Sequence, residues 1–238
     1  HLVTQWRDEW MKLYPSATIL FATEDDFKPK TRQTLMNKIS TGDWDGVIVP
    51  MSSFEKIPMS PDIVQQFYDD QIIALESGIR EAKEGSNRNL TKELEKAKKR
   101  LMANLERQEA RWKKDIGPYF NELGIDMLFI DEAHGYKNLF FRTQMTRVPG
   151  VQGAYAQKSF DVEMKTKYIN RISDYKNVLF ATGTPITNSI SETYTMQKYL
   201  QPQLLSEKGI EAFDSWAKNF GETVTAVEVS PTGSGFRT

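Results

Sequence analysis

The stretch Met127-Leu-Phe-Ile130 runs directly into Asp131-Glu132-Ala133-His134, so that a short apolar run ends in two adjacent acids and a histidine. A short apolar run bounded by polar residues is typical of a buried β-strand. Acids at a strand tip suit nucleotide hydrolysis, because one can hold Mg²⁺ between the phosphates and another can position or deprotonate the attacking water. We therefore predict that Asp131 and Glu132 form a catalytic, metal-binding pair. Two solvated acids at the end of a strand would be the simpler interpretation of the pair alone.

A second apolar run ends in a turn of small residues, Leu179-Phe-Ala-Thr182-Gly183-Thr184-Pro185. Gly183 has no side chain, and the neighbouring threonines carry short hydrogen-bonding groups, so the turn can approach a ligand or another loop closely. Taken alone, this is an ordinary strand-to-helix turn. Its position after the acidic tetrapeptide makes Thr182, Gly183 and Thr184 candidate cofactor-binding residues.

Helices and short apolar strands alternate on both sides of a long helical segment. That segment holds almost no glycine or proline, and its leucines recur at spacings of three and four, which predicts an antiparallel helical hairpin. Alternating helices and strands indicate an α/β fold of three layers with a mostly parallel sheet, into which the hairpin is inserted. The predicted elements outside the hairpin are helices at 2–13, 29–40 and 161–174 and strands at 17–22, 44–50, 125–130 and 177–181.

We divide the chain into four parts on this basis. Residues 1–59 form the first part of the α/β lobe, 60–118 the hairpin, and 119–205 the second part of the lobe with both strand-to-turn junctions. Residues 206–238 are expected to form short helices and a flexible linker, because 230–235 are rich in serine and glycine.

The second arm of the hairpin is locally basic and could lie against phosphate. A solvated helix face is the simpler interpretation, because no aromatic residues alternate with the basic ones for base stacking. The basic residues of this arm are Lys92, Lys96, Lys98, Lys99, Arg100, Arg107, Arg111, Lys113 and Lys114.

Composition places few limits on function. The chain has 31 basic and 32 acidic residues, so no overall field indicates a nucleic-acid partner. It has no cysteine, which excludes disulfides and thiolate metal sites and fits a reducing, cytoplasmic location. No apolar run approaches the roughly 20 residues of a membrane span, so no membrane partner is expected. The chain begins with His1 inside an apparent amphipathic helix, which suggests a fragment of a longer protein.

Two of these motifs resemble those of a known family. Asp131–Asn138 resembles motif II of the Swi/Snf-type helicase-like ATPases of superfamily two, and Ala181–Asn188 resembles their motif III. Leu2–Trp10 is similar to the helix after motif Ia, and Trp44–Phe54 to the region around motif Ib. More narrowly, the arrangement is similar to the helicase portion of very large phage- and plasmid-borne proteins described as adenine-specific DNA methyltransferase/helicase.

The resemblance implies a RecA-like first lobe of a motor that binds ATP and Mg²⁺. Asp131 and Glu132 would handle the nucleotide and its metal. His134, which alone would be an ordinary satisfied polar residue, would link the ATP site to the loop at Thr182, Gly183 and Thr184.

The resemblance also implies partners. Ser52, Ser53, Lys137 and Asn138 would face duplex DNA. The other partners would be a second RecA-like lobe and further domains of the same parent chain. The parent would be a DNA-dependent ATPase that moves along DNA.

The chain departs from the family pattern in important ways. It has no G-x-x-x-x-G-K-[ST] phosphate loop, so the phosphate-loop strand of the lobe is missing, and it holds neither a second lobe nor a methyltransferase motif. We therefore expect this segment alone not to hydrolyse ATP, since catalysis here depends on positioning and charge neutralisation. A non-catalytic DNA- or protein-docking module on a degenerate motor fold is the alternative. A metal-dependent nuclease is disfavoured, because no further acids converge on the pair.

Overall fold

A computed structural model describes residues 2–112, 117–145, 156–187, 189–222, 228–229 and 236–237. The chain forms two compact units. The first unit comprises His1–Ile130 and Gln157–Leu179, and the second comprises Asp131–Ala156 and Phe180–Thr238. The predicted α/β class is confirmed, since short strands alternate with helices along the chain. Among the described residues, no helix is both long enough and apolar enough to cross a membrane.

The first unit begins with a small parallel sheet. Strand β1 (Ile19–Phe21) pairs with β2 (Gly46–Ile48), with Leu20 opposite Val47. Between them lie the 3₁₀ helix η1 (Glu24–Phe27) and α2 (Arg32–Thr41), and α3 (Met51–Phe54) follows β2. Helix α1 (Leu2–Leu13) contacts this sheet through Trp10, since a Cβ atom at Gly46 would lie 3.3 Å from the Trp10 ring. Glycine at this position therefore allows the indole to pack against the strand.

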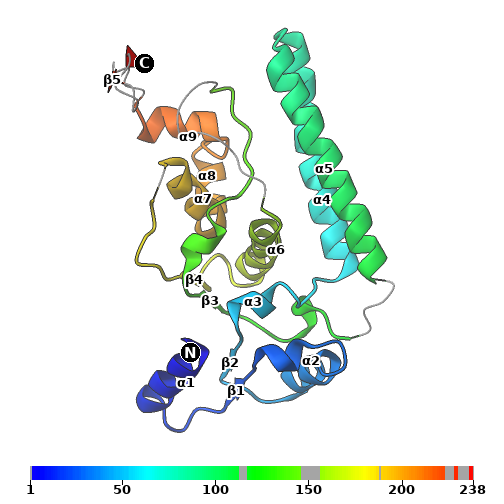
Figure 1. Cartoon of the computed structure of the whole chain (residues 1–238), viewed down its shortest axis with the longest axis vertical. Coiled ribbons are helices and arrows are strands. Elements are labelled where there is room, and N and C mark those ends of the chain that lie inside the picture. Colours follow the sequence, from blue (N-terminus) through cyan, green and yellow to red (C-terminus); the bar gives the residue numbers. More distant parts are fainter. Residues whose placement is uncertain are drawn as a thin grey trace. The chain divides into compact units, whose positions relative to one another are not determined.

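The long helices α4 (Pro61–Glu84) and α5 (Arg88–Trp112) form a hairpin and lie side by side along their length (Figure 1). Ser60 occupies the N-cap position of α4 without a capping hydrogen bond from its side chain, and Pro61 is the first helical residue, where a missing N–H is tolerated. The connecting turn bends through Ser86, which has a φ of 54°. Apolar side chains from both helices are buried, among them Val64, Phe67, Leu75, Ala82, Leu90, Leu94 and Leu101.

Helix α6 (Gln157–Ile172) belongs to the same unit and packs on the base of the hairpin. The ring centroid of Phe160 lies 4.8 Å from that of Phe67 and 5.1 Å from that of Tyr68, with edge-to-face geometry in both pairs. The 3₁₀ helix η2 (Phe120–Glu122) leads from the hairpin towards β3. Tyr168 of α6 donates a hydrogen bond to the carbonyl of Asn121, and this bond holds η2 against α6.

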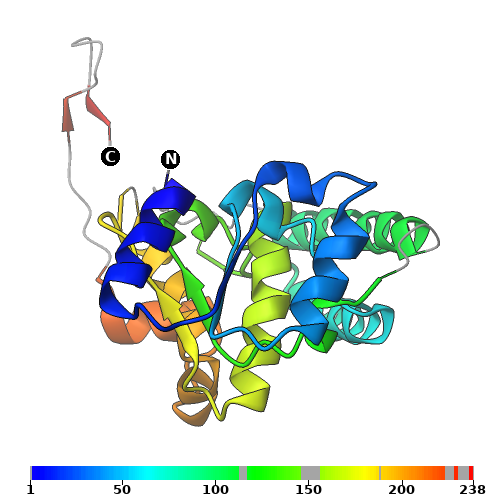
Figure 2. The same ribbon diagram turned by 90° about the horizontal axis from the view of Figure 1, so that it is seen from below.

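Strand β3 (Leu128–Ile130) neighbours β4 (Val178–Phe180), and Figure 2 shows their arrows side by side. In place of one larger sheet, the described residues form separate two-stranded sheets, β1–β2 and β3–β4. A third pair, β5 (Glu228–Val229) and β6 (Phe236–Arg237), is antiparallel and flanks the predicted linker at 230–235, which lies outside the described residues. The RecA-like arrangement therefore stays a prediction.

The second unit holds the 3₁₀ helix η3 (Ala133–Tyr136) and three further helices, α7 (Ser191–Leu200), α8 (Pro202–Glu207) and α9 (Phe213–Phe220). Its core is aromatic, with the Phe141 and Phe213 rings stacked at 4.3 Å. Tyr199 of α7 donates a hydrogen bond to the carbonyl of Tyr136, which ties η3 to α7. The members of the buried cluster are Phe141, Tyr194, Leu205, Phe213 and Trp216.

Candidate nucleotide site

The acidic turn, residues 131–137, leaves β3 with an unusual backbone conformation. Leu128 and Ile130 are buried in the strand, and Glu132 then adopts the left-handed conformation with φ 50° and ψ 41°. Its backbone N–H donates to Asp131 Oδ1 at 2.9 Å. A non-glycine residue in this region carries a steric cost, which the surrounding structure must offset. The sharp turn keeps the Glu132 side chain exposed at the end of the strand.

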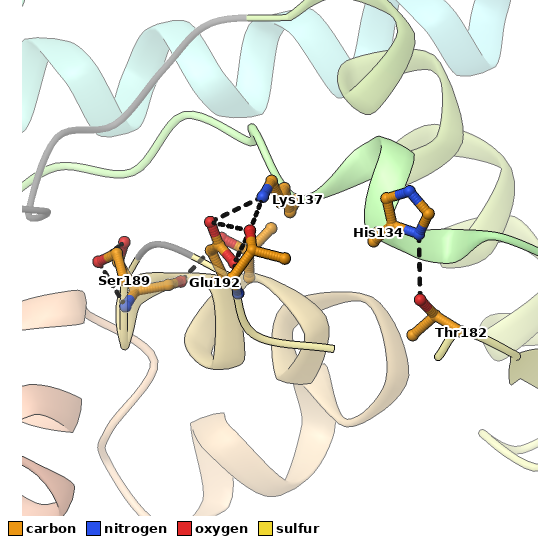
Figure 3. Close-up of polar contacts among 8 residues, drawn as sticks. His134, Lys137, Thr182, Ser189 and Glu192 are labelled. Atoms are coloured by element: carbon orange, nitrogen blue, oxygen red, sulfur yellow. Dashed lines mark hydrogen bonds and ion pairs between the residues drawn. The ribbon is translucent and has the colours of Figure 1, made fainter. Parts of the chain in front are cut away.

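His134 joins the acidic turn to the threonine loop, residues 181–187. Its Nδ1 lies 3.1 Å from Thr182 Oγ1, a contact shown in Figure 3, and 3.1 Å from Glu132 Oε2. Nδ1 therefore lies close to both oxygens, and the tautomer of the imidazole decides whether it donates to Thr182 Oγ1 or accepts from it. Thr182 Oγ1 also accepts the backbone N–H of Thr184 at 3.1 Å. A continuous polar chain therefore runs from Glu132 to the backbone of the threonine loop.

The threonine loop is also held to the acidic turn by Lys137. Lys137 Nζ lies 3.0 Å from Glu192 Oε1 and donates a hydrogen bond to Thr187 Oγ1 (Figure 3). Burial alone would raise the pKa of Glu192. The hydrogen bond from the Thr187 backbone N–H, at 2.7 Å, and the Lys137 ammonium together lower that pKa below its ordinary value. Glu192 is therefore a fixed anion that anchors the loop.

The four residues predicted to face DNA differ in exposure. Ser52 is exposed and donates to Glu24 Oε1 at 2.6 Å, whereas Ser53 is completely buried. The Lys137 side chain is only 15% exposed and faces Glu192, and Asn138 is exposed. In this structure only Ser52 and Asn138 could meet a partner without rearrangement. Their DNA-facing role stays a prediction.

The sequence identified the residues of the acidic turn and the threonine loop but missed Glu192. The sequence did offer a signal for Glu192, because it is an acid in the first turn of a helix that follows the threonine loop. Asn188, the last residue of the stretch that resembles motif III, lies outside the described residues. Gly183 is exposed, and a Cβ atom added there would meet no atom of the described residues within 4 Å. The space beside Gly183 is therefore open to another group.

The acids of the turn fit Mg²⁺ bound together with a nucleotide. Within the described ranges, no group of three or more His, Asp or Glu residues could hold a metal ion. Mg²⁺ commonly uses one or two carboxylates, with waters and substrate phosphates completing its shell. Asp131 and Glu132 supply such a set, and Thr182, which contacts His134, offers a neutral hydrogen-bonding group together with the neighbouring Thr184.

An α/β chain with the tetrapeptide Asp131–His134 at a strand tip, bonded through its histidine to a second strand-to-turn junction, has the features of a helicase-like protein. The family described as "Probable helicase domain" matches residues 3–234, and the chain belongs to this family.

The chain is also similar to "Defense against restriction protein B" of Escherichia phage P1, with 25% identity over 193 residues. That match covers 79% of this chain but 8% of the phage protein, so the chain spans a small fraction of its relative's length. No solved structure matches the chain.

Proposed function

We propose that this chain contributes the metal-binding strand tip of a RecA-like first lobe in an ATP-driven DNA translocase or helicase of the Swi/Snf type. One observation carries the proposal. His134 Nδ1 lies 3.1 Å from Thr182 Oγ1, so the residues that resemble motifs II and III are in direct contact. Membership of the probable helicase domain family supports the same conclusion.

The roles of the residues follow from their positions. Asp131, with its Glu132 neighbour, would hold Mg²⁺, which would supply positive charge to neutralise the nucleotide phosphates. Glu132 would position the attacking water or accept its proton. The contact at 3.1 Å between Glu132 Oε2 and His134 Nδ1 would hold the carboxylate in position for this role.

His134 would act as a positioning residue that relays changes at the acids to the threonine loop. The relay is short, because the imidazole contacts both Glu132 and Thr182 through the same nitrogen. Lys137 and Glu192 fix the far end of the loop, so a shift at Thr182 would move a tethered segment. Such an arrangement can couple nucleotide state to a DNA-facing surface.

The proposal extends to the longer protein that contains this chain. A relative from phage P1 supports a phage- or plasmid-borne parent, and its much greater length leaves room for a second lobe, a phosphate loop or a methyltransferase. The parent would act on duplex DNA in the cytoplasm.

The test is DNA-stimulated ATPase activity of the full-length protein that contains this chain. Three samples are compared, the full-length protein, its Glu132→Gln variant and the 238-residue chain. Hydrolysis by the first sample alone supports the motor and the role of Glu132. An inert full-length protein that folds and binds DNA would overturn the proposal.

The second candidate is a docking module without catalysis. The observation that favours it is the absence of a G-x-x-x-x-G-K-[ST] phosphate loop from the whole sequence. It predicts that a full-length protein without such a loop still binds DNA or a partner protein. In that case Glu132→Gln would leave binding unchanged.

A further inference from the structure

One face of α5 carries an exposed stripe of basic side chains, which the proposed site does not use. At 3.6 residues per turn, its five members fall within about 100° around the helix axis. The buried leucines of α5 lie on the opposite side, against α4. The basic stripe consists of Lys92, Lys96, Lys99, Arg100 and Arg107, and all five residues are exposed.

The acids near the stripe do not neutralise it. Glu95 lies 3.2 Å from Lys83 of α4, and Glu76 of α4 pairs with Lys98, which lies outside the stripe. Within the described residues, none of the five stripe cations has an ion pair at 4.0 Å or less. Glu93 and Glu106 of α5 flank the stripe, but within the described part of the chain they form no ion pair with it, so the stripe presents positive charge to solvent without direct ion-pair partners.

Neighbours along the stripe carry the same charge. Lys92 and Lys96 are four residues apart, as are Lys96 and Arg100, and like charges at this spacing destabilise a helix. A merely solvated helix would more commonly alternate acids and bases at these positions. The repulsion is relieved when an anion lies along the helix, so the pattern favours a polyanionic ligand.

The charge is also distributed unevenly between the two arms. Helix α4 carries six acidic and two basic residues, whereas α5 carries eight basic and four acidic ones. The whole chain is nearly neutral, so this separation is local to the hairpin. One edge of the hairpin can therefore attract an anion that the protein as a whole does not.

We infer that the basic stripe of α5 binds the phosphate backbone of duplex DNA. This inference rests on the proposed function for the choice of DNA as the polyanion, and it names a surface that holds the DNA. Lys92 and Arg107 are about 22 Å apart along the axis, which spans roughly six phosphates of one strand. No aromatic residue lies between them for base stacking, which favours a duplex over a single strand.

The test measures binding of a labelled short duplex to the 238-residue chain, without nucleotide, over a range of salt concentrations. The variant replaces Lys92, Lys96 and Lys99 with glutamine, which has a helix propensity similar to that of lysine. We expect at least a tenfold loss of affinity at low salt. The slope of log K against log salt should fall by about 2.7, since each lost phosphate contact removes about 0.9.

The matched control changes the net charge equally at exposed positions elsewhere, by replacing Lys30, Lys208 and Lys218 with glutamine. It should keep the affinity and the salt slope of the wild-type chain. Circular dichroism checks that both variants retain their helices.

Three results would overturn the inference. The first is a stripe variant with wild-type affinity and slope, and the second is a wild-type chain that binds no duplex at low salt. The third is a stripe variant that binds DNA like the wild-type chain but no longer self-associates in light scattering. That result would mean that the stripe binds the acidic face of α4 in a second copy of the chain. Because the assay contains no nucleotide, failure of the ATPase proposal would leave its result intact.

Discussion

Lys137 Nζ lies 3.0 Å from Glu192 Oε1, and the two side chains are only 15% and 8% exposed. This nearly buried ion pair connects the acidic turn to the first turn of α7. Glu192 also accepts the backbone N–H of Thr187, so a single carboxylate holds both the lysine and the threonine loop. The loop is thus fixed at one end by His134 and at the other by Glu192.

Removal of this carboxylate charge should destabilise the second unit. We expect Glu192→Gln to lower the free energy of unfolding by about 2 kcal/mol, because hydrogen bonds to a charged group are lost and Lys137 keeps its buried charge. Urea unfolding at neutral pH measures the change. Lys176→Met, which removes an exposed pair with Asp174, is the control and should have no measurable effect.

The Lys137–Glu192 pair also predicts that the stability of the chain depends on pH. The pKa of Glu192 is lower in the folded chain than in the unfolded chain, so its contribution is complete above the unfolded pKa. That contribution is lost as the pH falls through the folded pKa. The stability difference between wild type and Glu192→Gln should therefore shrink in acid. A difference that stays constant from neutral pH to strongly acidic pH would contradict the assignment.

The left-handed backbone conformation of Glu132 should lower the free energy of unfolding of the chain. Its φ of 50° is unfavourable for any residue with a side chain, whereas glycine adopts it readily. We expect Glu132→Gly to raise the free energy of unfolding by about 0.5–1 kcal/mol, although the proposed catalytic carboxylate is lost. Chemical denaturation measures this.

Ser86→Gly offers a matched control, because Ser86 has a φ of 54° in the hairpin turn, outside the candidate site. It should be stabilising to a similar extent. If Ser86→Gly stabilises the chain and Glu132→Gly destabilises it, the contact of Glu132 with His134 outweighs the backbone cost. The expectation of a strained site would then be wrong.

The sequence predicted the elements because their signals are local. The leucine spacing of the hairpin and the apolar runs at β3 and β4 each depend on neighbouring residues. Burial was less predictable. Phe129 and Leu179 lie in strands expected to be buried, and each is 49% exposed.

Polar contacts between distant residues could not be predicted from local patterns. Nothing near Lys137 in the sequence indicates Glu192, because the turn and α7 meet only in the folded unit. Ser53 illustrates the same limit, since the family resemblance implied a DNA-facing role although the side chain is buried. The tetrapeptide Asp131–His134 was recognisable because its four residues are consecutive.

Lys165 should be essential for the packing of α6 in the first unit. Its ammonium group is completely buried, donates to the Phe54 carbonyl at 2.8 Å and to Asp161 at 2.6 Å, and lies 4.3 Å from the Phe54 ring centroid. We expect Lys165→Met to lower the free energy of unfolding by about 3 kcal/mol, because the Asp161 charge loses its partner. Arg171→Met, at the exposed end of the same helix, should have little effect.

The lowered pKa of Lys165 also predicts that the stability of the folded chain rises at alkaline pH. Burial lowers its pKa, and the nearby Asp161 only partly opposes this. Between the folded and unfolded pKa values the unfolded chain binds more protons, so stability increases with pH in that window. Lys165→Met should lack this increase. A variant with the same alkaline profile as wild type would show that another group is responsible.

The tautomer of His134 can be tested directly, since the chain has only two histidines, His1 and His134. We expect the proton of the neutral imidazole on Nδ1, because this nitrogen lies 3.1 Å from the Glu132 carboxylate. Long-range ¹H–¹⁵N spectra distinguish the tautomers, and a His1→Asn variant assigns the signals.

Thr182→Val should leave the proton on Nδ1, since Glu132 remains as its acceptor. Glu132→Ala should shift the population towards Nε2–H, because the Thr182 hydroxyl can then donate to a bare Nδ1. A wild-type spectrum with the proton on Nε2 would separate Glu132 from His134 and remove the first link of the proposed relay.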